Sequence, residues 1–244
     1  MYQEATYNQV TLETVEALRK IVGADNVLIE AEDVSPFTHD ETVGLSAHPE
    51  VVVQATTTQQ VSEIIKLAQT ARIPVTPRGG GYGLSGGAVA IYGGIVLSLA
   101  KMNRVLEIDH ENLMVTVEPG LITGDLHRAV EEEGLFYPPD PASLDSCTIG
   151  GNVAEGAGGP RAVKYGVTRD YVLGLTVALP TGQIIKTGVE TMKGVAGYDL
   201  TRLIIGSEGT LAVITSITLR LVPKPLARKT MIVFFQDVPS AVKT

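Results

Sequence analysis

The chain has 244 residues, 44% of them hydrophobic, so it can bury a sizeable core and long disordered tracts are not expected. Its 27 acidic and 19 basic residues give a net charge of −8, which argues against a nucleic-acid-binding protein with a basic face. The single cysteine, Cys147, excludes an internal disulfide and any metal site built from several cysteines, and it favours a reducing cytoplasm.

The first third of the chain predicts a β-α-β arrangement. Apolar residues recur at helical spacing over 11–21, and Gly23 follows as a stop signal. Thr57 and Gln60 form a capping-box pattern ahead of a second helix that ends near Arg72. Since this helix joins two expected strands, we expect those strands to pair in parallel. Short apolar runs place strands at 27–29, 51–53 and 74–76.

The remainder predicts an α+β fold rather than a strict β-α alternation. Hairpin turns are expected at 110–112 and 181–182, and Gly134 is expected to close a helix. Pro223 and Pro225 end the last long strand, after which 230–235 is expected to begin a new strand. The other strands are expected at 95–99, 105–108, 113–117, 173–179, 183–186 and 211–221, and the helix at 126–133.

The segment 77–87 reads PRGGGYGLSGG and directly follows an expected strand. Six of the nine residues from Gly79 to Gly87 are glycine. Glycine lets the backbone approach a ligand closely and permits positive φ angles, which turn several N–H groups the same way. Such a nest of amides binds an anion, usually a phosphate. A flexible loop is disfavoured, because glycine is entropically costly and the rest of the chain is well patterned.

Residues 81–86 also match G-x-G-x-x-G, and Glu107 and Asp109 follow about 20 residues later, as in a nicotinamide-dinucleotide site. That kind of site needs its last glycine to open an amphipathic helix. The sequence after Gly86 has further glycines, no capping residue and no helical stripe, which disfavours this alternative.

A second stretch, 137–159, reads YPPDPASLDSCTIGGNVAEGAGG, a rigid proline loop followed by small residues. Two interpretations fit it: a wall packed against a flat aromatic ligand, or tight helix–strand packing in an ordinary core. A third segment, 206–215, reads GSEGTLAVIT and leads from a turn directly into the last long strand.

Together with the stretch KYGVTRDYVLGLTVALPTG, these segments resemble the PCMH-type FAD-binding domain of the vanillyl-alcohol-oxidase superfamily. They are most similar to the branch of the glycolate oxidase FAD subunit and FAD-linked D-lactate dehydrogenases. The resemblance covers roughly residues 40–222 and is specific, because four motifs recur in the right order. It implies one FAD-binding domain over 1–222, built from two α+β subdomains (about 1–103 and 104–222) with FAD between them. It also implies that 223–244 begin a truncated C-terminal cap domain.

The resemblance further implies which residues bind FAD. The pyrophosphate loop would contain Pro77, Arg78, Gly79, Gly80, Gly81, Tyr82, Gly83 and Leu84. The flavin side would be lined by Pro139, Asp140, Pro141 and Ser143, and the ribityl chain and ring would be held by Thr148, Ile149, Gly150, Gly151 and Asn152, with Ala157 and Gly158 nearby. The adenine half would lie near Gly166 and Val172, and the cofactor would be covered by Glu208, Gly209 and Ile214.

Three positions depart from the family pattern or bear on how FAD is held. Gly156 stands where the family usually has asparagine. Tyr82 stands where some relatives carry a flavin-linking histidine, so non-covalent, dissociable FAD is expected. Cys147 is one position away from a flavin-linking cysteine of other relatives, and we interpret it as a small buried thiol.

No catalytic residue is identified and no metal site is expected, because the four histidines, interpreted as surface or loop residues, lack metal-ligand spacing. In relatives the substrate base and metal ligands lie in the cap domain. The histidines are His39, His48, His110 and His127. The candidate anion contacts are Arg78, Arg161, Lys164 and Arg169, and for each of them a solvated surface role is the favoured alternative.

The resemblance implies an FAD-dependent oxidoreductase subunit that oxidises a 2-hydroxy acid, such as glycolate or D-lactate, by hydride transfer to FAD. Partner subunits for electron transfer are expected, whereas nucleic acid and direct membrane insertion are not; the location would be cytoplasmic, at most peripheral to a membrane-associated complex. One alternative is a flavin-carrying electron-relay module, or a truncated FAD-binding fragment, without its own substrate site. Another is a different superfamily substrate: an alcohol, a phenol or a cytokinin.

Overall fold

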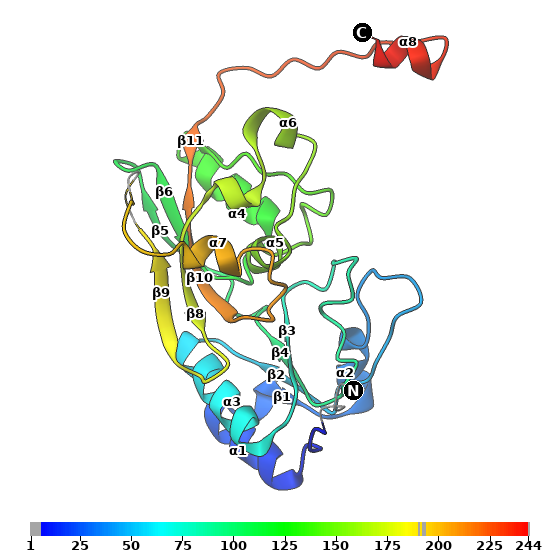
Figure 1. The fold of residues 1–244 in the computed structure, drawn as a ribbon, viewed down its shortest axis with the longest axis vertical. Coiled ribbons are helices and arrows are strands. Elements are labelled where there is room, and N and C mark those ends of the chain that lie inside the picture. Colours follow the sequence, from blue (N-terminus) through cyan, green and yellow to red (C-terminus); the bar gives the residue numbers. More distant parts are fainter. Residues whose placement is uncertain (1–5, 190, 192–193, 244) are drawn as a thin grey trace.

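The computed structural model describes residues 6–189, 191 and 194–243. In this part of the chain, helices cover two main β-sheets (Figure 1). The helices are α1 (Leu12–Val22), α2 (Ala31–Val34), α3 (Thr58–Ala71), α4 (Thr123–Glu132), α5 (Ile149–Glu155), α6 (Ala162–Tyr165), α7 (Leu200–Ile204) and α8 (Val238–Val242). The strands are β1 (Val27–Leu28), β2 (Val51–Gln54), β3 (Val75–Arg78), β4 (Ile95–Ser98), β5 (Val105–Asp109), β6 (Met114–Val117), β7 (Leu135–Phe136), β8 (Val172–Ala178), β9 (Ile184–Gly188), β10 (Val213–Arg220) and β11 (Val222–Pro223).

The first sheet has the strand order β1-β2-β4-β3 among the described residues. Strands β2 and β3 each run parallel to β4, and Val51 and Val75 both pair with Ile95. The expected parallel direction of β2 and β3 is therefore correct, but their expected direct pairing is wrong, because β4 lies between them. All residues of β4 are buried, as suits the central strand of a parallel sheet covered on both faces.

Alternating strand residues give this sheet two different faces. On one face, Val51 and Val53 join a core with Leu18 of α1 and Ile64 of α3. On the opposite face, Val52 packs in a smaller cluster beneath α2.

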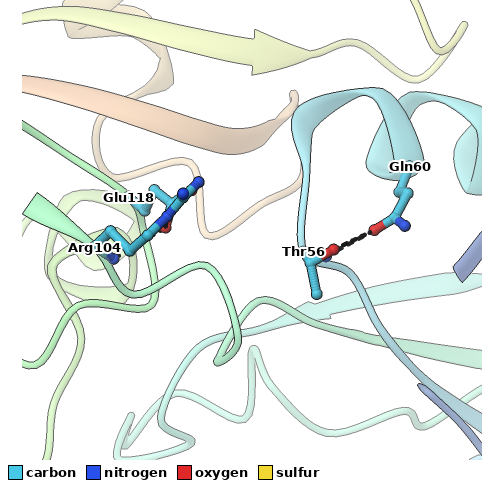
Figure 2. Close-up of polar contacts among 4 residues, drawn as sticks. All are labelled: Thr56, Gln60, Arg104 and Glu118. Atoms are coloured by element: carbon cyan, nitrogen blue, oxygen red, sulfur yellow. Dashed lines mark hydrogen bonds and ion pairs between the residues drawn. The ribbon is translucent and has the colours of Figure 1, made fainter. Parts of the chain in front are cut away.

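The predicted cap of α3 forms, with one change in its partners. The Thr57 hydroxyl accepts a hydrogen bond from the Gln60 backbone N–H at 3.2 Å. The Gln60 side chain reaches back one residue further than a standard capping box: its Oε1 accepts from the N–H and the hydroxyl of Thr56, at 2.8 and 2.9 Å (Figure 2).

The second sheet is antiparallel, with the order β5-β6-β10-β8-β9 among the described residues. Both predicted hairpins, β5–β6 and β8–β9, are confirmed. Apolar side chains of α4, α5 and α7 form one core with this sheet. Helix α4 begins at Thr123, earlier than expected, because Thr123 and Gly124 donate their backbone N–H groups to the carbonyls of Cys147 and Leu144, at 3.0 and 2.9 Å. These remote partners leave no local sequence signal.

Helix α3 joins the two sheets, because Ala178 of β8 and Val213 share its core. The buried Ser62 hydroxyl of α3 donates to the carbonyl of Gly182, in the β8–β9 turn, at 2.5 Å. The subdomain boundary proposed near Asn103 falls between β4 and β5 and stays a prediction.

An ion pair links the residue before β5 to the residue after β6. The Arg104 guanidinium donates to both carboxylate oxygens of Glu118, at 2.8 and 3.1 Å, and its backbone N–H donates at 2.9 Å (Figure 2). Glu118 is buried although Arg104 is largely exposed.

The strand expected at 230–235 is wrong: these described residues belong to no strand, and their apolar side chains are exposed. A strand needs a neighbour, and beyond β11 the chain runs away from the two sheets before α8 (Figure 1). None of the helices in the described ranges has the length and apolar character that crossing a bilayer requires.

Candidate functional site

A cavity of about 270 Å³ lies where the two sheets meet. The loop after β3 forms one wall, the segment that leads into and includes α5 forms another, and the turn before β10 closes the third side. Residues far apart in sequence therefore converge on one space, and all three segments are ones in which the family resemblance predicts cofactor contacts.

The loop after β3 presents backbone amides rather than side chains. Among the hydrogen bonds of the described residues, none has a backbone N–H of 79–83 as its donor. A side chain on Gly79 would overlap the Thr148 hydroxyl, and Gly81 has a φ of +76°, which side chains disfavour. The absence of side chains thus lets the loop lie against the second wall with its N–H groups unpaired.

Arg78, at the end of β3, supports this loop from below. Its guanidinium donates to the carbonyls of Ala88 and Pro36, both at 3.2 Å, and lies 5.6 Å from the ring centre of Phe37. The favoured surface role is wrong for Arg78, which is buried. Burial lowers the pKa of its guanidinium, which the negative charge of Asp40 partly opposes.

The second wall is held by hydrogen bonds beneath it. The Thr148 hydroxyl accepts from the N–H of Gly151 at 3.3 Å and caps α5. The buried Asn152 amide donates to the Thr123 hydroxyl at 2.7 Å. Gly150 packs directly on Pro119, where a Cβ would overlap the proline ring. The small residues thus pack tightly on one side and line the cavity on the other, and contact with an aromatic ligand stays a prediction.

Most of the residues expected to contact a cofactor line the cavity, and six do not. Those in the lining are Pro77, Arg78, Gly79, Gly80, Gly81, Tyr82, Gly83, Leu84, Pro141, Ser143, Thr148, Gly150, Gly151, Asn152, Ala157, Glu208, Gly209 and Ile214. Those outside it are Pro139, Asp140, Ile149, Gly158, Gly166 and Val172.

Two of the outlying residues have a clear structural role. The side chains of Ile149 and Val172 are buried in the core of the second sheet. The lining also contains residues that sequence reasoning missed: Gly87, Ala88, Cys147, Ala154, Glu155, Ala212 and Val213. Ala154 and Glu155 had a usable signal, since they follow Gly151 at helical spacing on α5.

The backbone conformation at position 156 explains why glycine stands there in place of the family's usual asparagine. It ends α5 in the left-handed conformation, with a φ of +71°. Asparagine is one of the few other residues that adopts this conformation readily, so both residue types meet the same backbone requirement. A Cβ at Gly156 would meet only the Cα of Gly206, at 3.8 Å.

The other singled-out residues separate into buried and exposed groups. Cys147 is buried, as expected, and its sulfur lies 3.3 Å from the Thr123 hydroxyl. His127 is also buried, which makes its interpretation as a surface residue wrong: its Nε2 lies 2.9 Å from the Pro139 carbonyl oxygen. Burial chiefly lowers the pKa of His127, so the neutral ring donates to that carbonyl. The exposed histidines are His39, His48 and His110.

The remaining candidate anion contacts lie outside the cavity lining. Arg161 is half-buried and pairs with Asp140, Nε to Oδ2, at 3.1 Å. Lys164 and Arg169 are exposed. In the part of the chain that the structure describes, no group of three or more histidine, cysteine or acidic side chains is arranged to hold a metal ion.

Comparison with known proteins identifies the kind of domain. Residues 49–188 match the family described as "FAD binding domain". The chain is 46% identical over 235 residues to the glycolate oxidase subunit GlcD of Bacillus subtilis, covering 96% of this chain and 50% of that protein. It is also 46% identical over 242 residues to a D-lactate dehydrogenase of Anaerostipes hadrus, covering 99% and 50%. The chain thus spans about half the length of these relatives.

Solved structures with the same architecture support the fold. An alkyldihydroxyacetonephosphate synthase superposes with a TM-score of 0.79 at 22% identity, covering 93% of this chain and 43% of that one. A p-cresol methylhydroxylase with bound substrate superposes with a TM-score of 0.77 at 26% identity, covering 88% and 44%. The α+β fold expected from the sequence is confirmed.

Proposed function

The chain belongs to the FAD binding domain family, and from that premise we propose that it carries the flavin of an oxidoreductase that oxidises a 2-hydroxy acid of the glycolate or D-lactate type. Bound FAD would supply the hydride acceptor of this reaction. The chain's own residues would bind and orient the cofactor and exclude water from it.

The cavity fits FAD in two respects. The unpaired amides of 79–83 suit a diphosphate, which needs several donors and no bulky side chains. The small residues Gly150, Gly151 and Ala154 leave a flat, mainly apolar wall, which suits an aromatic ring system. The individual assignments of residues to the pyrophosphate, ribityl chain, ring and adenine remain proposals.

The observation that carries the substrate class is the 46% identity to the glycolate oxidase subunit and to the D-lactate dehydrogenase over nearly the whole chain. Those proteins are about twice as long as the matched region, so the substrate and the electron acceptor are proposals for the whole enzyme. We further propose that electrons pass from FAD to a partner subunit. The cytoplasmic location of the protein stays a prediction.

A second candidate is a flavin-carrying module without its own substrate site. A 2-hydroxy acid needs a cation for its carboxylate, and among the described residues that line the cavity the one basic side chain is Arg78. Its guanidinium already donates to two backbone carbonyls. The anchoring cation would therefore come from elsewhere in a longer enzyme, or be lacking in a relay module.

Anaerobic spectroscopy separates these candidates. The chain, alone and within its complete reading frame, is loaded with FAD and mixed with D-lactate or glycolate, with L-lactate as the matched control. Bleaching of the flavin absorption by D-lactate or glycolate supports the proposed reaction. Retention of the oxidised spectrum with every 2-hydroxy acid, in a complete protein that holds FAD, would refute it and favour the relay module.

A further inference from the structure

Two carboxylates share one hydroxyl at the wall of the cavity. Ser85 lies on the glycine loop, Glu155 ends α5 and Glu208 lies in the turn before β10. The Ser85 hydroxyl oxygen is 2.8 Å from Glu208 Oε2, and it is 3.3 and 3.4 Å from the two oxygens of Glu155. These three residues, which we name the carboxylate cluster, bring all three cavity walls into contact.

The carboxylate cluster has fewer protons than its close oxygen–oxygen contacts require. A hydroxyl has one proton to donate, and two ionised carboxylates are acceptors only. The short distance assigns the Ser85 proton to Glu208. Glu155 then faces a hydroxyl oxygen with no proton between them, unless Glu155 carries one itself. A protonated Glu155 would complete a chain in which Glu155 donates to Ser85 and Ser85 donates to Glu208.

The surrounding charges favour that extra proton. Asp40, in the loop before β2, adds negative charge, whereas the Arg78 guanidinium is held by backbone carbonyls beneath the glycine loop. On the other side, Arg169 lies behind Gly206, where its Nη2 would be 3.6 Å from a Cβ. Desolvation raises the pKa of Glu155, and the charge of Glu208 raises it further.

The cluster also lies against the amides proposed to hold the diphosphate. Glu155 Oε1 would be 3.0 Å from a Cβ on Gly83, and Glu155 and Glu208 both line the cavity. Both residues are exposed in the free cavity, so water still reaches their carboxylates although partial burial raises the pKa of Glu155. A diphosphate in the loop would replace part of that water and add two negative charges.

We propose that the cavity takes up a proton when FAD binds, and that the proton is held by the Glu155–Ser85–Glu208 cluster. This inference rests on FAD being the ligand of the proposed function. Bound FAD makes the protonated cluster more favourable than it is in the free chain, so binding and protonation strengthen each other. Affinity for FAD therefore falls as pH rises, by up to about tenfold per pH unit for one linked proton.

Titration calorimetry with flavin-free chain and FAD tests this directly. The binding heat is measured near neutral pH in phosphate and in Tris, whose different ionisation heats reveal the number of protons taken up, and the dissociation constant is measured from about pH 6 to about pH 8. We expect a net uptake of up to about one proton and a dissociation constant that rises with pH.

Three variants locate the proton. Glu155→Gln should remove most of the uptake, flatten the pH dependence and bind FAD more tightly than the parent at the alkaline end. Ser85→Ala should weaken the coupling, because the hydroxyl no longer links the two carboxylates. Glu132→Gln, an exposed change on α4 outside the cavity lining, is the matched control and should behave as the parent. Circular dichroism verifies that each variant is folded.

Several outcomes would overturn the inference while leaving FAD binding intact. These are FAD binding without proton uptake, a Glu155→Gln variant that keeps the parent's pH dependence, or a dependence on added Mg²⁺ in place of protons. Failure of the folded chain to bind FAD at any pH would instead overturn the proposed function.

Discussion

Replacing Gly81 by alanine should both destabilise the chain and weaken FAD binding. Gly81 has a φ of +76°, and its Cβ would overlap the guanidinium of Arg78. The left-handed backbone costs an alanine about 1–2 kcal/mol. The overlap forces a buried cation to move, at the expense of its bonds to Ala88 and Pro36, each worth about 1.5–3 kcal/mol because the donor is charged.

Gly44 provides a matched control. It has the same φ of +76°, but a Cβ there would meet nothing within 4 Å. Gly44→Ala should therefore show the backbone cost alone, about 1–2 kcal/mol. Allowing for partial relaxation of Arg78, Gly81→Ala should lose about 1–4 kcal/mol more than Gly44→Ala.

Thermal unfolding and FAD titration measure the two effects. Since 1 kcal/mol shifts the Tm of a chain of this size by about 2–4 °C, the extra loss in Gly81→Ala is readily resolved. Its FAD affinity should fall at least about tenfold, because the loop amides turn away, whereas Gly44→Ala should bind FAD as the parent does. Equal loss of stability in the two variants, with unchanged FAD affinity in both, would refute the reasoning.

Three further predictions concern other parts of the molecule. Burial lowers the pKa of His127, so as pH falls the unfolded chain takes up this proton before the folded chain does. The stability that His127 contributes should be complete above the unfolded pKa of about 6.5 and be lost as pH drops below it. Unfolding titrations of a His127→Gln variant should no longer show this pH dependence. Desolvation opposes ionisation of Glu118, but hydrogen bonds from Arg104 outweigh it and lower the pKa of Glu118. The stability that the ionised Glu118 gives the fold should be complete above about pH 4.5 and be lost at more acid pH. Glu118→Gln should reduce the free energy of unfolding by about 1–2 kcal/mol near neutral pH, as measured by chemical denaturation. Acid precipitation of the FAD-loaded chain should release the flavin fluorescence to the supernatant, because Tyr82 has no chemistry for a histidyl link; fluorescence retained on the pellet would contradict this.

Local sequence signals predicted the helices α1, α3 and α4 and every strand of the two main sheets, but not α2, α5, α6, α7 and α8. The Thr57 cap, the Gly23 stop and the two hairpin turns each act within a few residues, so their effects are readable from the chain. Two features that the sequence did not predict depend on remote partners: the insertion of β4 between β2 and β3, and the early start of α4 against two distant carbonyls.

The candidate site follows the same division. Glycine content marked the loop after β3, because backbone approach and positive φ leave a compositional trace. The burial of Arg78 and His127 has no signal in the composition, since each side chain bonds to carbonyls contributed by another segment. Helical spacing from Gly151 could have placed Glu155 at the cavity, but its contacts with Ser85 and Glu208 were not predictable because Ser85 and Glu208 lie far from Glu155 in the sequence.

An absorption spectrum of the purified chain, recorded before and after addition of FAD and removal of the excess, tests most directly whether the amides after β3 and the small-residue wall form a flavin site. We predict the visible bands of a bound flavin in stoichiometric amount, and their loss in Gly81→Ala. A folded chain that stays colourless in the presence of FAD would contradict the account.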